Sequence, residues 1–253
     1  MQAITGLTRE QLAELARRVG ERIGQVVRPG GRPSAAGMLA SVAMVVALLR
    51  ENLTQRVAGA FFGVSQSTVS RRWDLLREPI ALALANVVPA PDEIAGTSTV
   101  LVDGTLVPTW GWRHHDDLYN KRHEDHGMNL QVAALYGHQL VAVGEPVPGA
   151  RHDAYAYHAS GLAQRLEGLD VLGDLGYVGV DDITTGNKKP VGGELTDNQK
   201  EANWKINGFR SHNEHVIGHL KNWKMLSHRY RAPLEKLAAA VRAIVALHFF
   251  RYA

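Results

Sequence analysis

The first third of the chain has the periodicity of helices. Thr8, followed by Gln11, has the spacing of a capping box, and apolar residues recur three and four positions apart behind it. Glycines and a proline then break the pattern, and a second helix is expected over residues 34–50. Two shorter helices are expected to begin at Thr54 and Ser65. The pattern predicts an all-α domain over residues 1–85.

The period changes to that of strands after a segment rich in proline and polar residues, which we interpret as a linker over residues 86–96. Strand-like runs then cover 97–103, 128–136 and 139–147, the last two joined by the hairpin signal Gly137-His138. A helix over 155–166, a buried strand over 169–174 and a long helix capped by Thr196 follow. The order βββαβα predicts an α/β domain over residues 97–253, with basic helices at its end.

Charge is distributed unevenly. The formal net charge is +3, but residues 103–181 carry 11 acidic and 5 basic side chains, whereas residues 200–253 carry 3 acidic and 10 basic. Residues 1–102 are also basic overall. Basic flanks suit a polyanion such as DNA, and an acidic centre would repel DNA unless cations bound there. A solvated surface would explain the same charges, so they support DNA binding only together with motifs.

Composition excludes several classes of protein. The chain has 253 residues, of which 45% are apolar and 21% charged, as in ordinary globular proteins. It has no cysteine, which excludes disulfides and thiolate metal sites. The start is acidic and polar, unlike a signal peptide, and the apolar run 38–49 is too short to span a bilayer. We therefore expect a cytoplasmic protein, associated with the nucleoid, that has no membrane partner.

Residues 53–76 have the pattern of a helix-turn-helix. Gly63 supplies a tight turn and Ser65 caps the second helix, while Val69 and Trp73 would pack inward. Short polar side chains at a helix start enter the major groove, and arginines reach phosphates or guanine edges. The expected DNA-binding residues of this helix are Gln66, Ser67, Thr68, Arg71 and Arg72. A helical hairpin with incidental arginines is the alternative, which the coincidence of turn, cap and double arginine disfavours.

Three carboxylates are candidates for chemistry. Asp103 and Asp174 each end a short apolar strand, and glycines beside them leave room for a ligand. Either aspartate alone would be read as a turn or helix cap. Glu214 lies on the long helix in one stripe with Arg210 and Lys221, which alone would be read as a surface ladder. In a βββαβα order, adjacent strands bring the aspartates together, and a helix crossing the sheet edge adds the glutamate.

Oxygen ligands of this kind suit Mg²⁺ or Mn²⁺. Three close carboxylates need a counter-charge, because they cannot all stay ionised without one. Two ions about 3.5–4 Å apart activate a water or a 3′-hydroxyl and stabilise the leaving oxygen of a phosphodiester. We therefore expect two divalent ions at Asp103, Asp174 and Glu214.

Several motifs together resemble the DDE-type insertion-sequence transposases, in particular the group related to Harbinger transposases. They are VDGTLVP (102–108), the run from His126 to Gln131, PGARHD (148–153), DLGYVG (174–179), KKP (188–190), LTDNQKEAN (195–203), and Arg210 to Glu214 followed by 217–231. The resemblance covers about residues 50–235. It implies a ribonuclease-H-like fold with Asp103, Asp174 and Glu214 as the catalytic triad. Asn213 departs from the family, in which this position is usually apolar.

Supporting roles are expected for residues near these motifs. His152 and Asp153 match a family motif, and we favour a role behind the metal ligands over one in fixing the strand end. Histidines 114, 115, 123 and 126 would suggest zinc, but their loop shows no ligand geometry. The remaining basic residues expected to contact DNA are Lys121, Arg122, Lys188, Lys189, Arg210, Lys221, Lys224, Arg229 and Arg231.

The sequence thus predicts a transposase that cuts its own element ends and joins the 3′-hydroxyl to target DNA. Two ends need two active sites, so a homodimer on double-stranded DNA is expected. A catalytically silent or domesticated DNA-binding regulator, a stand-alone DNA endonuclease and a hydrolase of small phosphoesters remain as alternatives. The sequence gives neither the terminal repeats, the target site, the order of strand cuts nor the mobility of the element.

Overall fold

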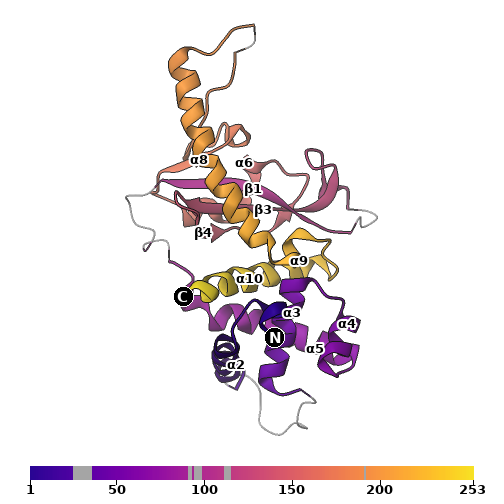
Figure 1. The fold of residues 1–253 in the computed structure, drawn as a ribbon. Helices are drawn as coiled ribbons and strands as arrows, with labels where there is room; N and C mark the ends of the chain where they lie inside the picture. The colour runs from indigo at the N-terminus through magenta and orange to yellow at the C-terminus, as the bar shows by residue number, and fades with distance from the viewer. Residues whose placement is uncertain (25–35, 91–92, 94–98, 111–114, 191) are drawn as a thin grey trace. The chain divides into compact units, whose positions relative to one another are not determined.

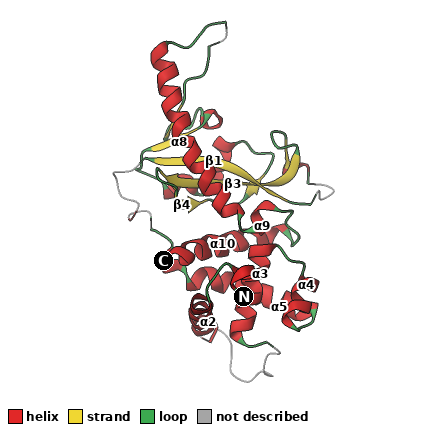
Figure 2. Ribbon diagram, viewed as in Figure 1, coloured by secondary structure: helices red, strands yellow, loops and turns green. Residues whose placement is uncertain are grey.

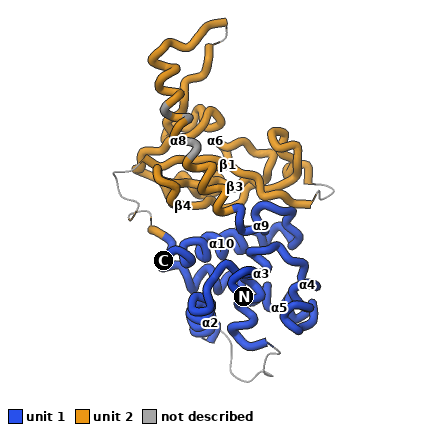
Figure 3. The backbone as a smooth tube through the Cα atoms, in the orientation of Figure 1, with its two compact units in different colours: residues 1–88, 221–253 blue, residues 89–220 orange. Residues whose placement is uncertain are grey.

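The computed structural model describes residues 1–24, 36–90, 93, 99–110, 115–190 and 192–253 (Figure 1). Inside the helix that spans 197–221, side chains 205, 207 and 209–211 are not described. The chain forms two compact units, one of residues 1–88 with 221–253 and one of residues 89–220 (Figure 3). We call them the helical unit and the mixed unit.

Where the structure describes the helical unit, its secondary-structure elements are helices (Figure 2). They are α1 (Gln2–Thr5), α2 (Arg9–Gly24), α3 (Met38–Glu51), α4 (Gln55–Phe62), α5 (Gln66–Ala83), η1 (Ala85–Val87), α9 (Lys224–Ser227), η5 (Leu234–Lys236) and α10 (Leu237–Tyr252). The capping box at the start of α2 is confirmed, because the Thr8 amide donates to Gln11 Oε1 at 3.0 Å and the Gln11 amide donates to Thr8 Oγ1 at 3.2 Å. Nine residues of α3 and ten of α10 are buried, so these two helices contribute much of the core.

Helices α4 and α5 are joined by a three-residue turn. Gly63 ends α4 with φ of +67°, a conformation that favours glycine, and Ser65 Oγ caps α5 by accepting from the Thr68 amide at 3.2 Å. Val69 and Trp73 are buried, as expected. A Cβ on Gly59 would lie 2.7 Å from the Val64 carbonyl oxygen, so the two helices approach as closely as they do only because this residue is glycine.

The compact units differ from the predicted division at the C-terminal end. The sequence placed residues 97–253 in one domain, whereas residues 221–253 cluster with the N-terminal helices. The physical reason is that α10 packs along α5 and η5 is held to α5 by a salt bridge between Lys236 and Asp74. The predicted linker, 86–96, lies partly outside the described residues.

The mixed unit is built on a seven-stranded sheet. Its strands are β1 (Val100–Pro108), β2 (Tyr119–Asn120), β3 (Asp125–Leu135), β4 (Gln139–Val143), β5 (Val147–Pro148), β6 (Val171–Gly173) and β7 (Ile183–Thr185). The order is β2-β3-β1-β6-β7, and β4 and β5 both pair with β3. β1 runs antiparallel to β3 and parallel to β6, and β6 runs parallel to β7. A mixed α/β architecture was predicted and is present.

The helices of this unit are η3 (Asp116–Leu118), α6 (Asp153–Ala159), α7 (Leu162–Arg165), η4 (Leu175–Tyr177) and α8 (Asp197–Lys221). The helix predicted over 155–166 is two short helices, because Gly161 between them adopts φ of +75°. Strand β1 extends past Asp103 to Pro108, so this aspartate lies inside a strand and not at its end. Strands β2, β5 and β7 were not predicted, since they are only two or three residues long.

Helix α8 lies against the middle of the sheet (Figure 1). Its predicted capping box is confirmed by reciprocal bonds between Thr196 and Gln199. Val216 and Leu220 are buried, and Asn213 is only 1% exposed. The Asn213 side-chain amide donates to the carbonyl oxygens of Leu101 in β1 and Val132 in β3, both at 3.3 Å. A buried polar group is stable where it finds such partners, so this asparagine fixes α8 on the sheet.

Candidate active site

Asp103 and Asp174 occupy equivalent positions on neighbouring parallel strands. β1 and β6 pair Leu101 with Leu172, and each aspartate lies two residues beyond that pair. Both carboxylates are half-buried. Asp103 accepts from the Gly104 amide at 2.8 Å, and Asp174 accepts from the Gly176 amide at 2.7 Å. The sheet register therefore brings together the two acids that lie 71 positions apart in the sequence.

A third carboxylate, Asp153 at the start of α6, lies beside this pair. Its oxygens lie where a side chain on Gly104 would have to be, and a Cβ on Gly176 would be 3.2 Å from Asp153 Oδ2 and 2.8 Å from Asp174 Oδ1. The glycines at positions 104 and 176 thus leave room for the Asp153 carboxylate. The sequence predicted a supporting position for Asp153, and the structure places its carboxylate against the β1 backbone next to Asp103 and close to Asp174.

A buried hydrogen-bond network holds Asp153. The side-chain amides of Asn129 and Gln131 on β3 each donate to its Oδ1 at 3.0 Å. Gln131 also accepts from the Tyr177 hydroxyl at 2.5 Å. Burial raises the pKa of Tyr177 well above its ordinary value, and the negative charges of Asp153, Asp103 and Asp174 raise it further. Tyr177 therefore stays a neutral hydrogen-bond donor. All three acids lie close enough to it to raise its pKa.

Glu214 is presented on the exposed side of α8, one residue after the buried anchor Asn213. Val132, which accepts from Asn213, is the cross-strand partner of Asp103. Asn213 therefore bonds to β3 beside the level of Asp103. In the sequence, Asn213 stands out only as a departure from the family pattern. Its burial and its two bonds were not recognisable from spacing alone.

The carboxylates of Asp103 and Asp174 provide part of a site for a divalent ion that prefers oxygen ligands. Carboxylates carried by neighbouring strands are the ligands that Mg²⁺ and Mn²⁺ prefer. Within the described residues, however, no group of three or more His, Cys, Asp or Glu side chains is arranged to hold a metal ion. Asp103 and Asp174 therefore provide the fitting pair, and convergence of Glu214 stays a prediction.

The neighbouring predicted residues take separate roles. His152 Nδ1 accepts from the Tyr155 amide at 3.2 Å and so caps α6, which positions the helix that carries Asp153. Arg122 extends from the turn after β2, and its guanidinium lies 3.8 Å from Asp153 Oδ2. Lys121 is exposed in the same turn. Of the histidines considered for zinc, His114 lies outside the described residues.

The polar start of α5 is exposed on the helical unit. Gln66, Ser67 and Arg71 are exposed, and Thr68 and Arg72 are half-buried. The Gln66 side-chain amide donates to Gln55 Oε1 at 2.5 Å, which joins the first residues of α4 and α5. Gln55 is not among the DNA-binding residues that the sequence predicts. Its position at the start of the preceding helix was the only signal for it.

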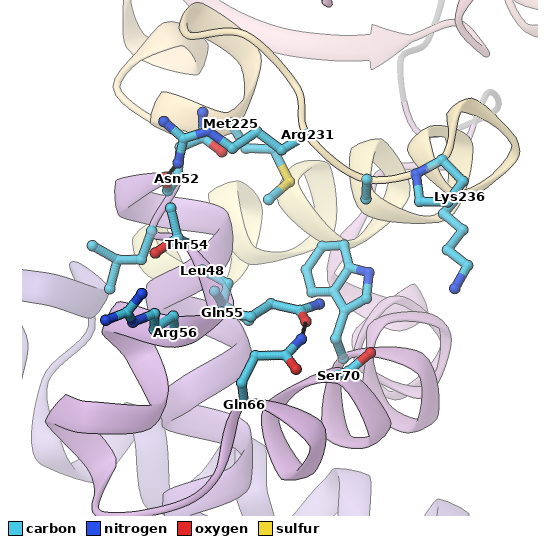
Figure 4. A pocket seen from close by; sticks show the side chains of 14 residues that line it. Leu48, Asn52, Thr54, Gln55, Arg56, Gln66, Ser70, Met225, Arg231 and Lys236 are labelled. Carbon is cyan, nitrogen blue, oxygen red and sulfur yellow. Dashed lines mark hydrogen bonds between the residues drawn. The ribbon is translucent and has the colours of Figure 1, made fainter.

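A pocket of about 500 Å³ opens beside these residues (Figure 4). Gln55, Gln66 and Ser70 line one side, and Arg231 and Lys236 line another. Arg231 donates to the Asn52 carbonyl oxygen at 3.0 Å, which holds the segment after α9 close to α4. The fold thus brings Arg231 close to the start of α5, although 165 positions separate it from Gln66 in the sequence.

The other predicted basic residues are dispersed. Lys188 and Lys189 are exposed in the loop between β7 and α8, and Lys221 is half-buried at the end of α8. Arg210 lies in α8, but its side chain is outside the described part. Lys224 forms an ion pair with Glu51, and Arg229 is exposed, with its carbonyl oxygen accepting from Asn52 at 3.2 Å.

Comparison with known families explains why these residues occur together. The family model described as DDE superfamily endonuclease matches residues 102–248, more than half of the chain. The chain belongs to this family. The match begins one residue before Asp103 and includes Asp153, Asp174 and Glu214. The predicted resemblance is therefore confirmed.

Two curated relatives agree with this assignment. The chain is 30% identical over 223 residues to a putative transposase for insertion sequence element IS112 from Streptomyces albus G, covering 88% of this chain and 83% of the relative. It is 28% identical over 214 residues to a probable transposase for insertion sequence element IS702 from Microchaete diplosiphon, covering 81% and 76%. No solved structure matches the chain. None of the helices in the described ranges combines the length and apolarity needed to span a membrane.

Proposed function

We propose that the protein is a DNA transposase whose mixed unit cuts DNA at the ends of its own element and joins the freed 3′ end to target DNA. The observation that carries the proposal is the equivalent position of Asp103 in β1 and of Asp174 directly after the parallel neighbour β6, each two residues beyond the Leu101–Leu172 pair, inside the segment that matches the endonuclease family. The relatives' descriptions as insertion-sequence transposases support the same activity.

The sheet order supports a ribonuclease-H-like fold for the mixed unit. β4, β3 and β1 form an antiparallel meander, and β6 and β7 continue from β1 in parallel. Along the chain, β1, β3, β4, α6, β6 and α8 follow one another, which supports the predicted βββαβα order. The carboxylates project from the central strand and its parallel neighbour, which is where two side chains can act on one phosphate.

Asp103, Asp174 and Glu214 are proposed to hold one or two Mg²⁺ or Mn²⁺ ions. When bound, such ions supply Lewis-acid stabilisation of the scissile phosphate and lower the pKa of an attacking water. The chain's own residues orient the reacting groups. Asp153, fixed by Asn129 and Gln131, is proposed to add negative charge beside the strand aspartates, and the nearby Arg122 guanidinium is proposed to contact a phosphate oxygen of the bound strand.

In the proposed hydrolysis, a water oxygen attacks phosphorus, the bond to the 3′ oxygen breaks, and a proton from the water ends on solvent. The products are a 3′-hydroxyl and a 5′-phosphate. In the joining step, that 3′-hydroxyl oxygen attacks a phosphorus of the target, and the target's own 3′ oxygen leaves. In each step one phosphorus–oxygen bond forms as another breaks, so the reaction needs no external energy source.

The helices α4 and α5 are proposed to act as the helix-turn-helix that recognises the element ends. The hydrogen bond from Gln66 to Gln55 leaves Gln66 with an acceptor oxygen and a second amide hydrogen. That combination matches the N6 and N7 edge of adenine in the major groove. Arg71, Arg72 and Arg231 are proposed to contact the adjoining phosphates, which would fix the register of the helix.

Two element ends require two copies of the active site, so we propose a homodimer on double-stranded DNA. The corresponding location is the nucleoid. Binding without cutting would instead identify a DNA-binding regulator, and cutting without joining would identify a stand-alone endonuclease.

The test uses the DNA that flanks the gene. Duplexes containing inverted repeats from that DNA are incubated with the full chain, Mg²⁺ and a supercoiled target. We expect nicks at the repeat ends and covalent joining of the labelled 3′ end to the target. Cleavage without joined product would contradict the transposase assignment, and absence of both would contradict the nuclease assignment.

A further inference from the structure

Four histidines of the mixed unit gather where the β3–β4 turn meets α8. His138 lies in the turn, and His212, His215 and His219 lie on α8. The His138 ring centroid is 4.3 Å from that of His212 and 4.6 Å from that of His215, and the His215 and His219 centroids are 4.7 Å apart. These histidines belong to neither the aspartate pair nor the predicted DNA-binding residues.

His215 and His219 are already arranged as a pair of ligands. They are four residues apart, so they lie on one face of α8, and both are exposed. Their Nε2 atoms are 3.0 Å apart. Two imidazole nitrogens bound to one tetrahedral zinc ion at 2.0–2.1 Å would be separated by about 3.4 Å. A shift of a few tenths of an ångström would therefore place one ion between them.

His138 is the residue best placed to add a third nitrogen. Its Nδ1 faces the carbonyl oxygen of His212 at 3.4 Å, which leaves Nε2 as the atom for a ligand. The His138 side chain is exposed, so its ring has space to turn toward His215. His212 stacks between Tyr136 and His138, with ring centroids 4.3 Å from each, and thereby supports the His138 ring.

We propose that His215 and His219, joined by His138, form a binding site for a late first-row divalent metal ion such as Zn²⁺. Imidazole nitrogens favour zinc, nickel and copper, whereas Mg²⁺ prefers oxygen. Within the described residues, no three of these side chains converge on one point. The proposed site is therefore completed when the His138 ring rotates toward the bound ion. The bound ion connects the β3–β4 turn to α8 and stiffens the helix that carries Glu214. The site does not depend on the proposed transposase activity.

The test is a calorimetric titration of the full, untagged chain with Zn²⁺. A large excess of Mg²⁺ is present throughout, because it occupies carboxylate sites without competing for imidazole. We expect one zinc ion per chain. The affinity should fall at least about tenfold in His215→Ala and in His219→Ala, and by a smaller factor in His138→Ala. His158→Ala, which removes an exposed histidine of α6, and Asp103→Asn should leave the affinity unchanged.

Hydrogen exchange gives a second measurement. Zinc should slow exchange of the α8 amides around residues 212–219 in the unaltered chain and in His158→Ala, but not in His219→Gln. The proposal is overturned if the double variant His215→Ala, His219→Ala binds zinc with unaltered affinity and stoichiometry. It is equally overturned if the unaltered chain binds no zinc. Neither result concerns DNA cleavage, so failure here is distinct from failure of the proposed function.

Discussion

Asp153 depends on the absence of a side chain at position 104. Its Oδ1 atom fills the space that a Cβ on Gly104 would need, and the Gln131 amide nitrogen lies only 2.8 Å from the same point. Both groups are held by buried hydrogen bonds, so neither can move without breaking the network that contains Asn129 and Tyr177. The proposed site therefore requires glycine at position 104, because the methyl group of an alanine would occupy the space of Asp153 Oδ1.

Gly104→Ala is therefore expected to displace Asp153 and to lower the DNA cleavage rate by about 10–100-fold, the usual effect of losing a supporting contact at a metal site. The rate is measured under single-turnover conditions. Gly218→Ala is the matched control, because a Cβ there meets nothing within 4 Å. Equal rates in the two variants would show that Asp153 has no part in the site.

The residue-scale features were only partly predictable. Asp103 and Asp174 were recognisable because each comes at the end of a short strand-like run and has a glycine within two residues. The network around Asp153 was not, since residues 129, 131, 153 and 177 meet only when β3, α6 and η4 are packed. Gln131 was noted as part of a motif, but its role in joining Asp153 to Tyr177 required the fold.

Helix α8 combines a structural anchor and a proposed catalytic acid on consecutive residues. Asn213 is buried and bonded to two strands, whereas Glu214 is exposed. Substitution of Asn213 should therefore change the stability of the fold, whereas substitution of Glu214 should change DNA cleavage.

Asn213→Ala is expected to lower the free energy of unfolding by about 1–3 kcal/mol, because it removes two buried hydrogen bonds and leaves a void. Urea denaturation measures this change. Glu214→Gln should alter stability by less than about 0.5 kcal/mol, as exposed substitutions usually do, yet it should abolish DNA cleavage. If Glu214→Gln cleaves at the unaltered rate, Glu214 is not a catalytic residue.

Helix α5 and η5 are connected through Asp74. Hydrogen bonding from Lys236, and then from Arg77, lowers the pKa of Asp74. A carboxyl with a lowered folded-state pKa adds stability above its unfolded pKa of about 3.9 and loses it as the pH falls through the folded value. Because Asp74 is 44% exposed, the contribution is below about 1 kcal/mol. Unfolding free energies of Asp74→Asn and the unaltered chain should differ at pH 7 and converge as the pH falls through the folded-state pKa of Asp74; a constant difference would contradict this account.

The start of α5 is expected to determine base preference. In a selection from randomised duplexes, Gln66→Ala should lose an adenine preference at one position, worth about 1–3 kcal/mol. Gln55→Ala should weaken the same preference less, since Gln55 only orients Gln66. Lys188 is not proposed to contact a base, so Lys188→Ala should keep the full adenine preference. Retention of the preference in Gln66→Ala would exclude this residue from base recognition.

Among elements, the long ones were predicted well. Helices α2, α3 and α8 and strand β3 have enough periodic residues, and caps at Thr8 and Thr196, to define them. Short strands such as β5 and β7 were missed, because two or three residues carry no period and exist only through pairing with β3 and β6. Likewise, α10 is uniformly apolar, so its sequence does not show which unit it joins.

At the scale of the whole molecule, each unit has a separate proposed task. The helical unit presents the polar start of α5 for recognition of element ends, and the mixed unit presents Asp103 and Asp174 for phosphodiester chemistry. The acidic centre and basic flanks of the sequence correspond to this division, because the basic residues 221–253 return to the helical unit. Binding and cutting should consequently be separable by mutation.

The central claim is that Asp103 and Asp174 act together on one phosphate. It is tested most directly by measuring, with one end-containing duplex, both the affinity and the single-turnover cleavage rate of Asp103→Asn and Asp174→Asn. The account predicts unchanged DNA affinity and cleavage reduced by at least about 100-fold in each variant, with little further loss in the double variant. Cleavage by either single variant at the rate of the unaltered chain would contradict it.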